Sequence, residues 1–192
     1  MNKTNLTIFA SGAGSNAKKI IEHFNHHPSI KCALVVCNNP KAGVKDIAAE
    51  NNIPLLMIEK TRFFKEDGYL PELQLHNIDY LILAGFLWKI PDLLIEKYAD
   101  KIINIHPALL PKYGGKGMYG QHVHQAVIDN KEEESGITIH LVDEQYDHGK
   151  HLFQASCKVD ATDTADTLAQ KIHALEHKHF APVIEKYITE NK

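Results

Sequence analysis

An amide and an imidazole stand two residues apart at the end of an apolar run, in the stretch INIHPALLPKY at positions 103–113. Residues two apart on an extended strand point to the same face, so we expect Asn104 and His106 to face the same way. Asparagine can donate an N–H to an oxygen that gains negative charge, and histidine can carry a proton near neutral pH. The pair suits nucleophilic attack on a carbonyl-type carbon. The competing interpretation is a satisfied histidine in a core strand, and spacing alone does not choose between them.

Such a histidine needs a carboxylate to orient it. Asp143, Glu144 and Asp147 lie in one loop, DEQYDHG. A carboxylate beside the imidazole would raise the pKa of the ring and hold its orientation. The spacing does not select one of the three. An acidic, solvated hairpin loop is the competing interpretation for Asp143 and Glu144.

A glycine-rich loop, SGAGSN at 11–16, follows the first predicted strand. Its last backbone amides would open a helix, where N–H groups and the helix dipole favour an anion. These amides belong to Gly14, Ser15 and Asn16. GAGSNA also matches a dinucleotide fingerprint, but the second predicted strand ends in CNNP, without an acidic ribose partner. We therefore expect a phosphate here, and the alternative is a tight turn with an N-cap serine.

A third pattern, HALEH at 173–177, spells the inverted zinc-protease motif H-x-x-E-H. His173 and His177 would share one face of a helix. The stretch lies late in a predicted capping helix, and no third ligand is evident downstream. We favour a helix with a polar face over a zinc site.

The elements that carry these residues alternate between strand and helix. Apolar runs predict strands, and amphipathic stretches between them predict helices, including 42–52, 65–77 and a short helix from Pro91 to Tyr98. The strands are predicted at 5–10, 30–39, 53–59, 79–86 and 101–106. The alternation indicates a parallel sheet covered on both faces. Ligands of such sheets lie beyond the carboxyl ends of the strands, which is where the glycine loop, GFLWKIP (85–91) and Asn104 with His106 fall.

The pattern changes after the fifth strand. A glycine-rich loop at 112–120 precedes a predicted helix at 121–130. His122 and His124 either approach the active site or belong to a mobile loop, and we favour the mobile loop. Two alternating strands, 135–144 and 151–159, should pair antiparallel, and a long helix begins after Thr162-Asp163. The expected fold is α/β, with a Rossmann-like, mostly parallel twisted sheet, helices on both faces, and a C-terminal antiparallel hairpin plus long helix.

Composition narrows the function classes. The 192 residues carry a net charge of −3, and the pI is about 6.5, so no basic field for nucleic acid is expected. The three cysteines indicate reduced thiols in a cytoplasmic protein. The first residues are too short and polar a run for a signal peptide, and no run approaches the roughly 18 apolar residues of a membrane span.

Five segments in fixed order, IFASGAGSN, LILAGFLWKIP, NIHPALLPKY, GITIHLVDEQYDHG and ALEH, resemble the phosphoribosylglycinamide formyltransferase family within the folate-dependent formyltransferases. The resemblance covers nearly the whole chain. It implies that 10-formyltetrahydrofolate, as co-substrate, gives its formyl group to the amine of 5′-phosphoribosylglycinamide in purine synthesis. It implies one domain over 1–192, with a phosphate-substrate half at 1–100 and a catalytic and folate half at 101–192. Small-molecule substrates, no nucleic acid, membrane or metal, and a monomer or homodimer complete the expectation.

The resemblance also assigns residues. Asn104 would bind the formyl oxygen, His106 would transfer the proton, and Asp147 would tune His106 and organise water. The substrate residues would be Gly14, Ser15 and Asn16 at the phosphate, and Glu176 at the ribose or the glycinamide end. The folate residues would be Leu87, Trp88, Lys89, Ile90, Asn104, His140, Asp143 and Glu144.

The chain departs from the family pattern at several points. Trp88 replaces a smaller or basic residue, the 112–120 loop is longer than usual, and HGKHLF replaces a Gly-Gly-Pro. Neither Arg62 nor Lys65 can be assigned to the folate tail. The rival readings are methionyl-tRNA formyltransferase, formyltetrahydrofolate hydrolase, a nucleotide-binding module without turnover, and a zinc hydrolase. The first is expected to have a further C-terminal domain and a basic surface, and the second an N-terminal regulatory domain.

Overall fold

The computed structural model describes residues 3–191, and its contacts divide the chain into two compact units with a boundary between Ile103 and Asn104. In the described residues the strand order is β3-β2-β1-β4-β5-β6-β7. Strand β5 (Ile102–His106) runs through the boundary. The predicted assignment of residues 1–100 to the phosphate substrate and of residues 101–192 to catalysis and folate stays a prediction.

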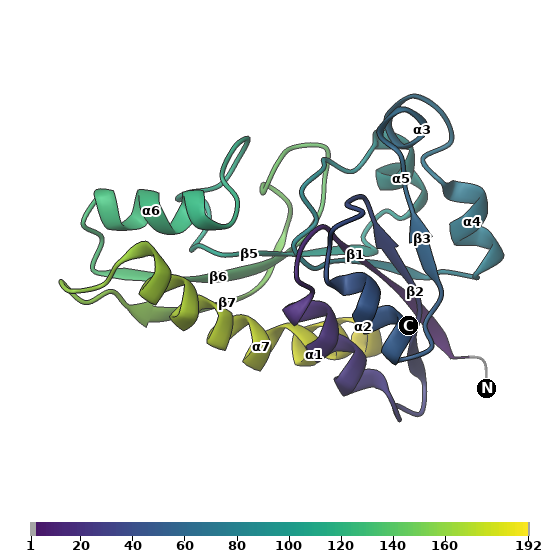
Figure 1. Cartoon of the computed structure of the whole chain (residues 1–192), viewed down its shortest axis with the longest axis horizontal. Coiled ribbons are helices and arrows are strands. Elements are labelled where there is room, and N and C mark those ends of the chain that lie inside the picture. The colour runs from purple at the N-terminus through teal and green to yellow at the C-terminus, as the bar shows by residue number, and fades with distance from the viewer. Residues whose placement is uncertain (1–2, 192) are drawn as a thin grey trace. The chain divides into compact units, whose positions relative to one another are not determined.

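The first unit carries a parallel sheet built from the predicted alternation. β1 pairs in parallel with β2 and with β4, and β2 pairs in parallel with β3. The last four residues of β2 and all four of β4 are buried, as a sheet covered on both faces requires. The elements are β1 (Thr4–Ala10), α1 (Ser15–Phe24), β2 (Ile30–Cys37), α2 (Val44–Glu50), β3 (Leu55–Met57), α3 (Lys60–Lys65), α4 (Leu70–Leu75), β4 (Tyr80–Leu83) and α5 (Asp92–Lys97) (Figure 1).

The single helix predicted over 65–77 is wrong, because this part of the chain holds the end of α3, a turn and α4. Gly68 and Tyr69 both have left-handed backbones, with φ of 58° and 61°. A right-handed helix cannot continue through two such residues. The Asp67 carboxylate accepts the Tyr69 N–H at 3.0 Å and closes the turn.

The second unit consists of the end of β5, the helices α6 and α7, and the predicted pair of antiparallel strands. β6 (Glu134–Leu141) pairs antiparallel with β7 (His151–Lys158), and the register shifts between Ile139 and His140. The long helix α7 (Ala165–Glu190) runs along both strands and packs on them (Figure 1). Helix α6 (Gln121–Asp129) packs on α7. A register irregularity re-aims side chains locally, and this one falls at a histidine of the site described below.

The predicted fold class is confirmed: a mostly parallel α/β sheet is followed by a C-terminal hairpin and a long helix. Within residues 3–191, no helix combines the length and the apolar character needed to cross a bilayer.

Candidate active site

A buried hydroxyl fixes the chain directly after β5. Thr138, in the middle of β6, is fully buried, and its Oγ1 donates to the carbonyl of Ala108 at 2.7 Å. The same oxygen accepts the N–H of Leu110 at 3.0 Å and the side-chain N–H of Gln154 at 2.8 Å. These bonds tie the loop at 107–111 to both strands of the hairpin. The histidine at the end of β5 therefore projects from a fixed backbone.

His106 is buried, with one ring nitrogen committed to the backbone. Its Nε2 lies 2.7 Å from the carbonyl oxygen of Tyr113. Because a carbonyl only accepts, Nε2 carries a proton, and the neutral ring keeps its lone pair on Nδ1. Nδ1 lies 3.6 Å from Oδ2 of Asp147. That distance is too long for a hydrogen bond but short enough that a proton gained on Nδ1 would face a carboxylate.

Asp147 is held by the backbone on both sides of this contact. Its own backbone is left-handed, with φ of 54°, and the Gly115 N–H donates to its Oδ2 at 2.9 Å. Tyr113, which presents its carbonyl to His106, is also left-handed, with φ of 56°. Non-glycine residues in this region are uncommon and cluster where a functional geometry is held. The predicted pair of His106 and Asp147 is thus brought together by two unusual backbone positions.

The amide of Asn104 is oriented by a second buried histidine. His140 Nδ1 lies 2.7 Å from the carbonyl of Leu141, so Nδ1 carries the proton and Nε2 is an acceptor. Nε2 takes one N–H of Asn104 at 3.0 Å. The side-chain amide has two N–H groups, and the second is left for another acceptor. His140 also lies 3.7 Å from Asp147, so it contacts both catalytic candidates that flank it.

The charges of this group follow from burial. Burial lowers the pKa of His106, although the nearby Asp147 carboxylate opposes the shift. Burial alone would raise the pKa of Asp147, but the ring of His140, the charge of His106 and the Gly115 N–H together bring it below its ordinary value. At neutral pH the site therefore holds a neutral imidazole and an ionised carboxylate. This is a base poised to accept a proton beside an anion that would stabilise the product.

The neighbouring acids behave differently. Asp143 accepts the Gln145 N–H at 2.8 Å and pairs with His148 at 3.0 Å within its own exposed loop. Glu144 is exposed. The structure brings Asp147 alone of the three to His106, as the family resemblance implied. The folate roles of Asp143 and Glu144 stay predictions.

A second buried carboxylate, Glu176, lies on α7. It is 5% exposed, and its Oε2 lies 2.9 Å from Nδ1 of His173, which raises the pKa of that histidine. The electrostatic neighbours of His106 include Glu176, so the two lie within range of each other in the second unit. No group of three or more His, Cys, Asp or Glu side chains among the described residues is placed to hold a metal ion.

The expectation that His122 and His124 belong to a mobile loop is wrong. Both lie in α6, where His122 is exposed and His124 is buried. The predicted helix at 121–130 already carried the signal: a histidine directly beside Val123 and three before Val127 falls on the apolar face.

In the first unit the glycine loop forms the N-terminus of α1. Gly14 is the N-cap residue with φ of 85°, and its carbonyl accepts the Lys18 N–H at 2.8 Å. A Cβ at Gly14 would lie 2.9 Å from Val44 Cα, so only glycine fits. The Asn39 side chain donates to the Ser11 carbonyl at 2.9 Å. The amide of Asn39, which follows β2, therefore holds the glycine loop. This arrangement places the backbone amides of Ser15 and Asn16 in the first turn of α1, where N–H groups and the helix dipole favour an anion.

The predicted folate segment, residues 87–90, is tied to this loop within the same unit. The Leu87 N–H donates to Ser11 Oγ at 3.0 Å, and the Ser11 N–H donates to the Gly85 carbonyl at 3.1 Å. Trp88 packs against the rings of Phe63 and Phe64, each at 5.7 Å between centroids. One serine thus connects the two ligand-binding segments predicted for this half.

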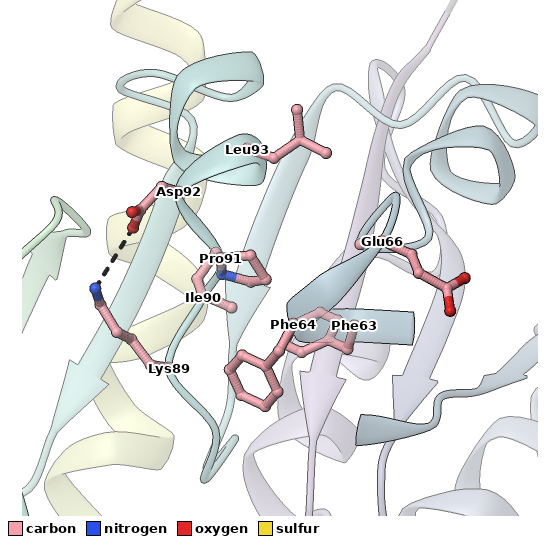
Figure 2. Close-up of a pocket in the computed structure, with 9 residues that line it drawn as sticks. Phe63, Phe64, Glu66, Lys89, Ile90, Pro91, Asp92 and Leu93 are labelled. Carbon is pink, nitrogen blue, oxygen red and sulfur yellow. Dashed lines mark hydrogen bonds and ion pairs between the residues drawn. The ribbon is translucent and has the colours of Figure 1, made fainter. Parts of the chain in front are cut away.

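Lys89 and Ile90 line a cavity of about 340 Å³ in the first unit. Figure 2 shows Lys89 paired with Asp92 on one side and Glu66 on the other, with two phenyl rings between them. The lining residues are Phe63, Phe64, Glu66, Gly68, Lys89, Ile90, Pro91, Asp92 and Leu93. The phenylalanines were not predicted as site residues, because their segment does not align with the family pattern.

Arg62 is one of two basic residues that the sequence did not assign to the folate tail, and in the structure it pairs with two carboxylates of its own unit. Its guanidinium binds Glu72 at 2.6 Å and Asp67 at 2.9 Å, and it lies 4.1 Å over the ring of Tyr69. A guanidinium saturated by two carboxylates has little capacity for a third. Arg62 therefore serves the turn between α3 and α4.

Comparison with known proteins places the chain in a family. A family model described as formyl transferase matches residues 4–184. Phosphoribosylglycinamide formyltransferase of Bacillus subtilis is 36% identical over 186 residues, which cover 94% of this chain and 93% of that protein. The crystal structure of phosphoribosylglycinamide formyltransferase from Bacillus halodurans has a TM-score of 0.88 at 29% identity, covering 98% of this chain and 97% of that one. The chain belongs to the formyl transferase family.

Within that family, the predicted resemblance to phosphoribosylglycinamide formyltransferases is confirmed. The chloroplastic phosphoribosylglycinamide formyltransferase of Arabidopsis thaliana is 40% identical over 185 residues, which are 93% of this chain and 63% of that protein. The chain thus spans somewhat less than two thirds of the plant relatives it matches.

Proposed function

We propose that the protein transfers the formyl group of 10-formyltetrahydrofolate to the amine of 5′-phosphoribosylglycinamide. The observation that carries the proposal is the group formed by Asn104, His106 and Asp147 in the second unit. It combines a free amide N–H, a neutral imidazole nitrogen and an ionised carboxylate. Attack of an amine on a formyl carbon requires an oxyanion donor, a proton acceptor and an anion to stabilise the protonated acceptor.

The reaction follows from these groups. The amine nitrogen forms a bond to the formyl carbon, and the carbonyl oxygen becomes an oxyanion that the second N–H of Asn104 binds. His106 Nδ1 takes the proton that the amine nitrogen loses, and the imidazolium then faces Asp147. The proton passes to N10 of the folate as the bond between the formyl carbon and N10 breaks. Tetrahydrofolate and the formylated amide leave, and His106 is neutral again.

The binding roles extend the proposal. The substrate phosphate is bound by the backbone amides of Gly14, Ser15 and Asn16 at the start of α1, and the fixed loop geometry supports this role. Glu176 binds the ribose of the same substrate. The folate is bound along residues 87–90, and the aromatic cavity beside Lys89 and Ile90 supports this role. His140 orients Asn104, and its predicted contact with the folate stays a prediction.

We also propose that the protein works in the reducing cytoplasm. Its three cysteines, Cys32, Cys37 and Cys157, are free thiols. Burial raises the pKa of Cys32 to about 12, so this thiol is unreactive at neutral pH.

A substrate-dependent assay tests the function. Purified protein is mixed with 10-formyltetrahydrofolate, and tetrahydrofolate formation is followed with and without 5′-phosphoribosylglycinamide. The proposal predicts product only when the amine is present. Equal release of formate without the amine would identify a hydrolase instead, and binding without turnover would identify a binding module.

A further inference from the structure

A buried histidine of the second unit has a ring nitrogen with no protein partner. His124 is 3% exposed, and its Nδ1 is buried without a hydrogen-bond partner among residues 3–191. Leaving a buried polar atom unpaired costs about 1–3 kcal/mol, and folded proteins rarely retain such an atom without a use. The nitrogen therefore points to a ligand that completes it.

The surroundings of His124 indicate which ligand this is. The charged groups that act on it are His173 and Glu176 from α7 and His106 from the end of β5. α6 packs directly on α7, and Glu176 is itself buried and bound on one side by His173. His124 is thus buried within electrostatic range of both the imidazole of His106 and the carboxylate proposed to bind the ribose, Glu176.

The charge of His124 excludes one class of ligand. Burial lowers the pKa of its ring, and the neighbouring His173 lowers it further. The ring is therefore neutral at pH 7 and offers one N–H and one lone pair. A neutral ring beside a buried carboxylate does not attract phosphate, but it matches the hydroxyl groups of a sugar, each of which both donates and accepts.

We propose that His124 is a further substrate-binding residue, whose Nδ1 hydrogen-bonds a ribose hydroxyl of the phosphoribosyl substrate next to the hydroxyl bound by Glu176. This inference rests on the proposed function and adds a recognition residue to it. Together the two side chains read the vicinal diol of the ribose and distinguish it from a deoxyribose.

Calorimetric binding tests the inference directly. Wild-type protein, His124→Leu and His124→Asn are titrated with 5′-phosphoribosylglycinamide and with its 2′-deoxy and 3′-deoxy analogues. His124→Asn keeps a polar atom near the position of Nδ1, and His122→Leu on the exposed side of the same helix is the matched control. Near-ultraviolet circular dichroism checks that each variant is folded.

The inference predicts a specific pattern. His124→Leu raises the Kd of the substrate by about five- to tenfold, the factor for one lost hydrogen bond. It leaves unchanged the Kd of the deoxy analogue that lacks the contacted hydroxyl. His124→Asn stays within about threefold of wild type, and His122→Leu within about twofold.

Two results would overturn it. One is an unchanged substrate Kd in folded His124→Leu, and the other is an equal loss for the substrate and both analogues. If the leucine variant does not fold, the ¹⁵N chemical shifts of the His124 ring in wild-type protein test the contact instead. These shifts should change when substrate is added, and unchanged shifts would reject the contact. If wild-type protein binds the substrate and transfers formyl but His124 proves not to contact the substrate, the proposed function stands and only the role of His124 is rejected. If wild-type protein binds no substrate, both the proposed function and the role of His124 are rejected.

Discussion

Asp147→Asn tests how much of the transfer depends on the charge that faces His106. The substitution keeps the size of the side chain and an oxygen for the Gly115 N–H, and it removes the negative charge. At the observed 3.6 Å between Nδ1 and Oδ2, the attraction between imidazolium and carboxylate is about 5 kcal/mol at an effective dielectric of about 20 and about 1 kcal/mol in bulk water. At about 1.4 kcal/mol per factor of ten, kcat falls between about fivefold and about 4,000-fold. The burial of both side chains, 5% and 13% exposed, favours a loss of about 100-fold or more.

The assay is steady-state formyl transfer at saturating concentrations of both substrates. Asp143→Asn is the matched control, because Asp143 pairs with His148 in an exposed loop and should matter less than about twofold. Circular dichroism spectra and Tm values establish that both variants are folded. A kcat of Asp147→Asn within fivefold of wild type, or equal losses in the two variants, would refute the assigned roles.

Three further predictions follow from the same geometry. Because burial lowers the pKa of His106, kcat/KM should be fully developed above pH 6.5 and should fall only as the pH drops through that lowered pKa; a limb centred above 6.5 would show that another group controls the rate. Gly14→Ala forces a Cβ into α2 at a φ of 85° and should raise the KM of the phosphoribosyl substrate by at least about fivefold, for a strain of about 1–3 kcal/mol. Gly12→Ala meets nothing within 4 Å and should leave that KM within about twofold, so equal effects would argue against the loop geometry. Thr138→Val should lower the free energy of unfolding by about 1–3 kcal/mol in urea titrations, and an unchanged value would remove its hydroxyl from the account of the loop after β5.

The sequence predicts the fold well where the hydrophobic pattern is unambiguous. The apolar run at 30–39 predicts a strand of the parallel sheet, and the alternating runs at 135–144 and 151–159 predict an antiparallel hairpin. The structure has both, as β2 and as the pair of β6 and β7. The prediction fails over 65–77, where a composition compatible with helix is interrupted by two left-handed residues. A single glycine is a weak signal for such a break, and a left-handed tyrosine gives none at all.

The side chains of the candidate site are more predictable than its backbone contacts. Asn104 and His106 stand out by spacing, and the family resemblance selects Asp147. The Tyr113 carbonyl and the Gly115 amide are invisible in a sequence, because every residue has these groups and only the folded loop aims them. The same holds for the partner of His140, which depends on where the register of β6 shifts.

Single-turnover measurements on His106→Asn test most directly whether the imidazole of His106 carries the proton during formyl transfer. We expect both substrates to bind with Kd values within about threefold of wild type, while the single-turnover rate falls by about 100-fold or more. Transfer at a rate within a few fold of wild type, with both substrates bound, would contradict it.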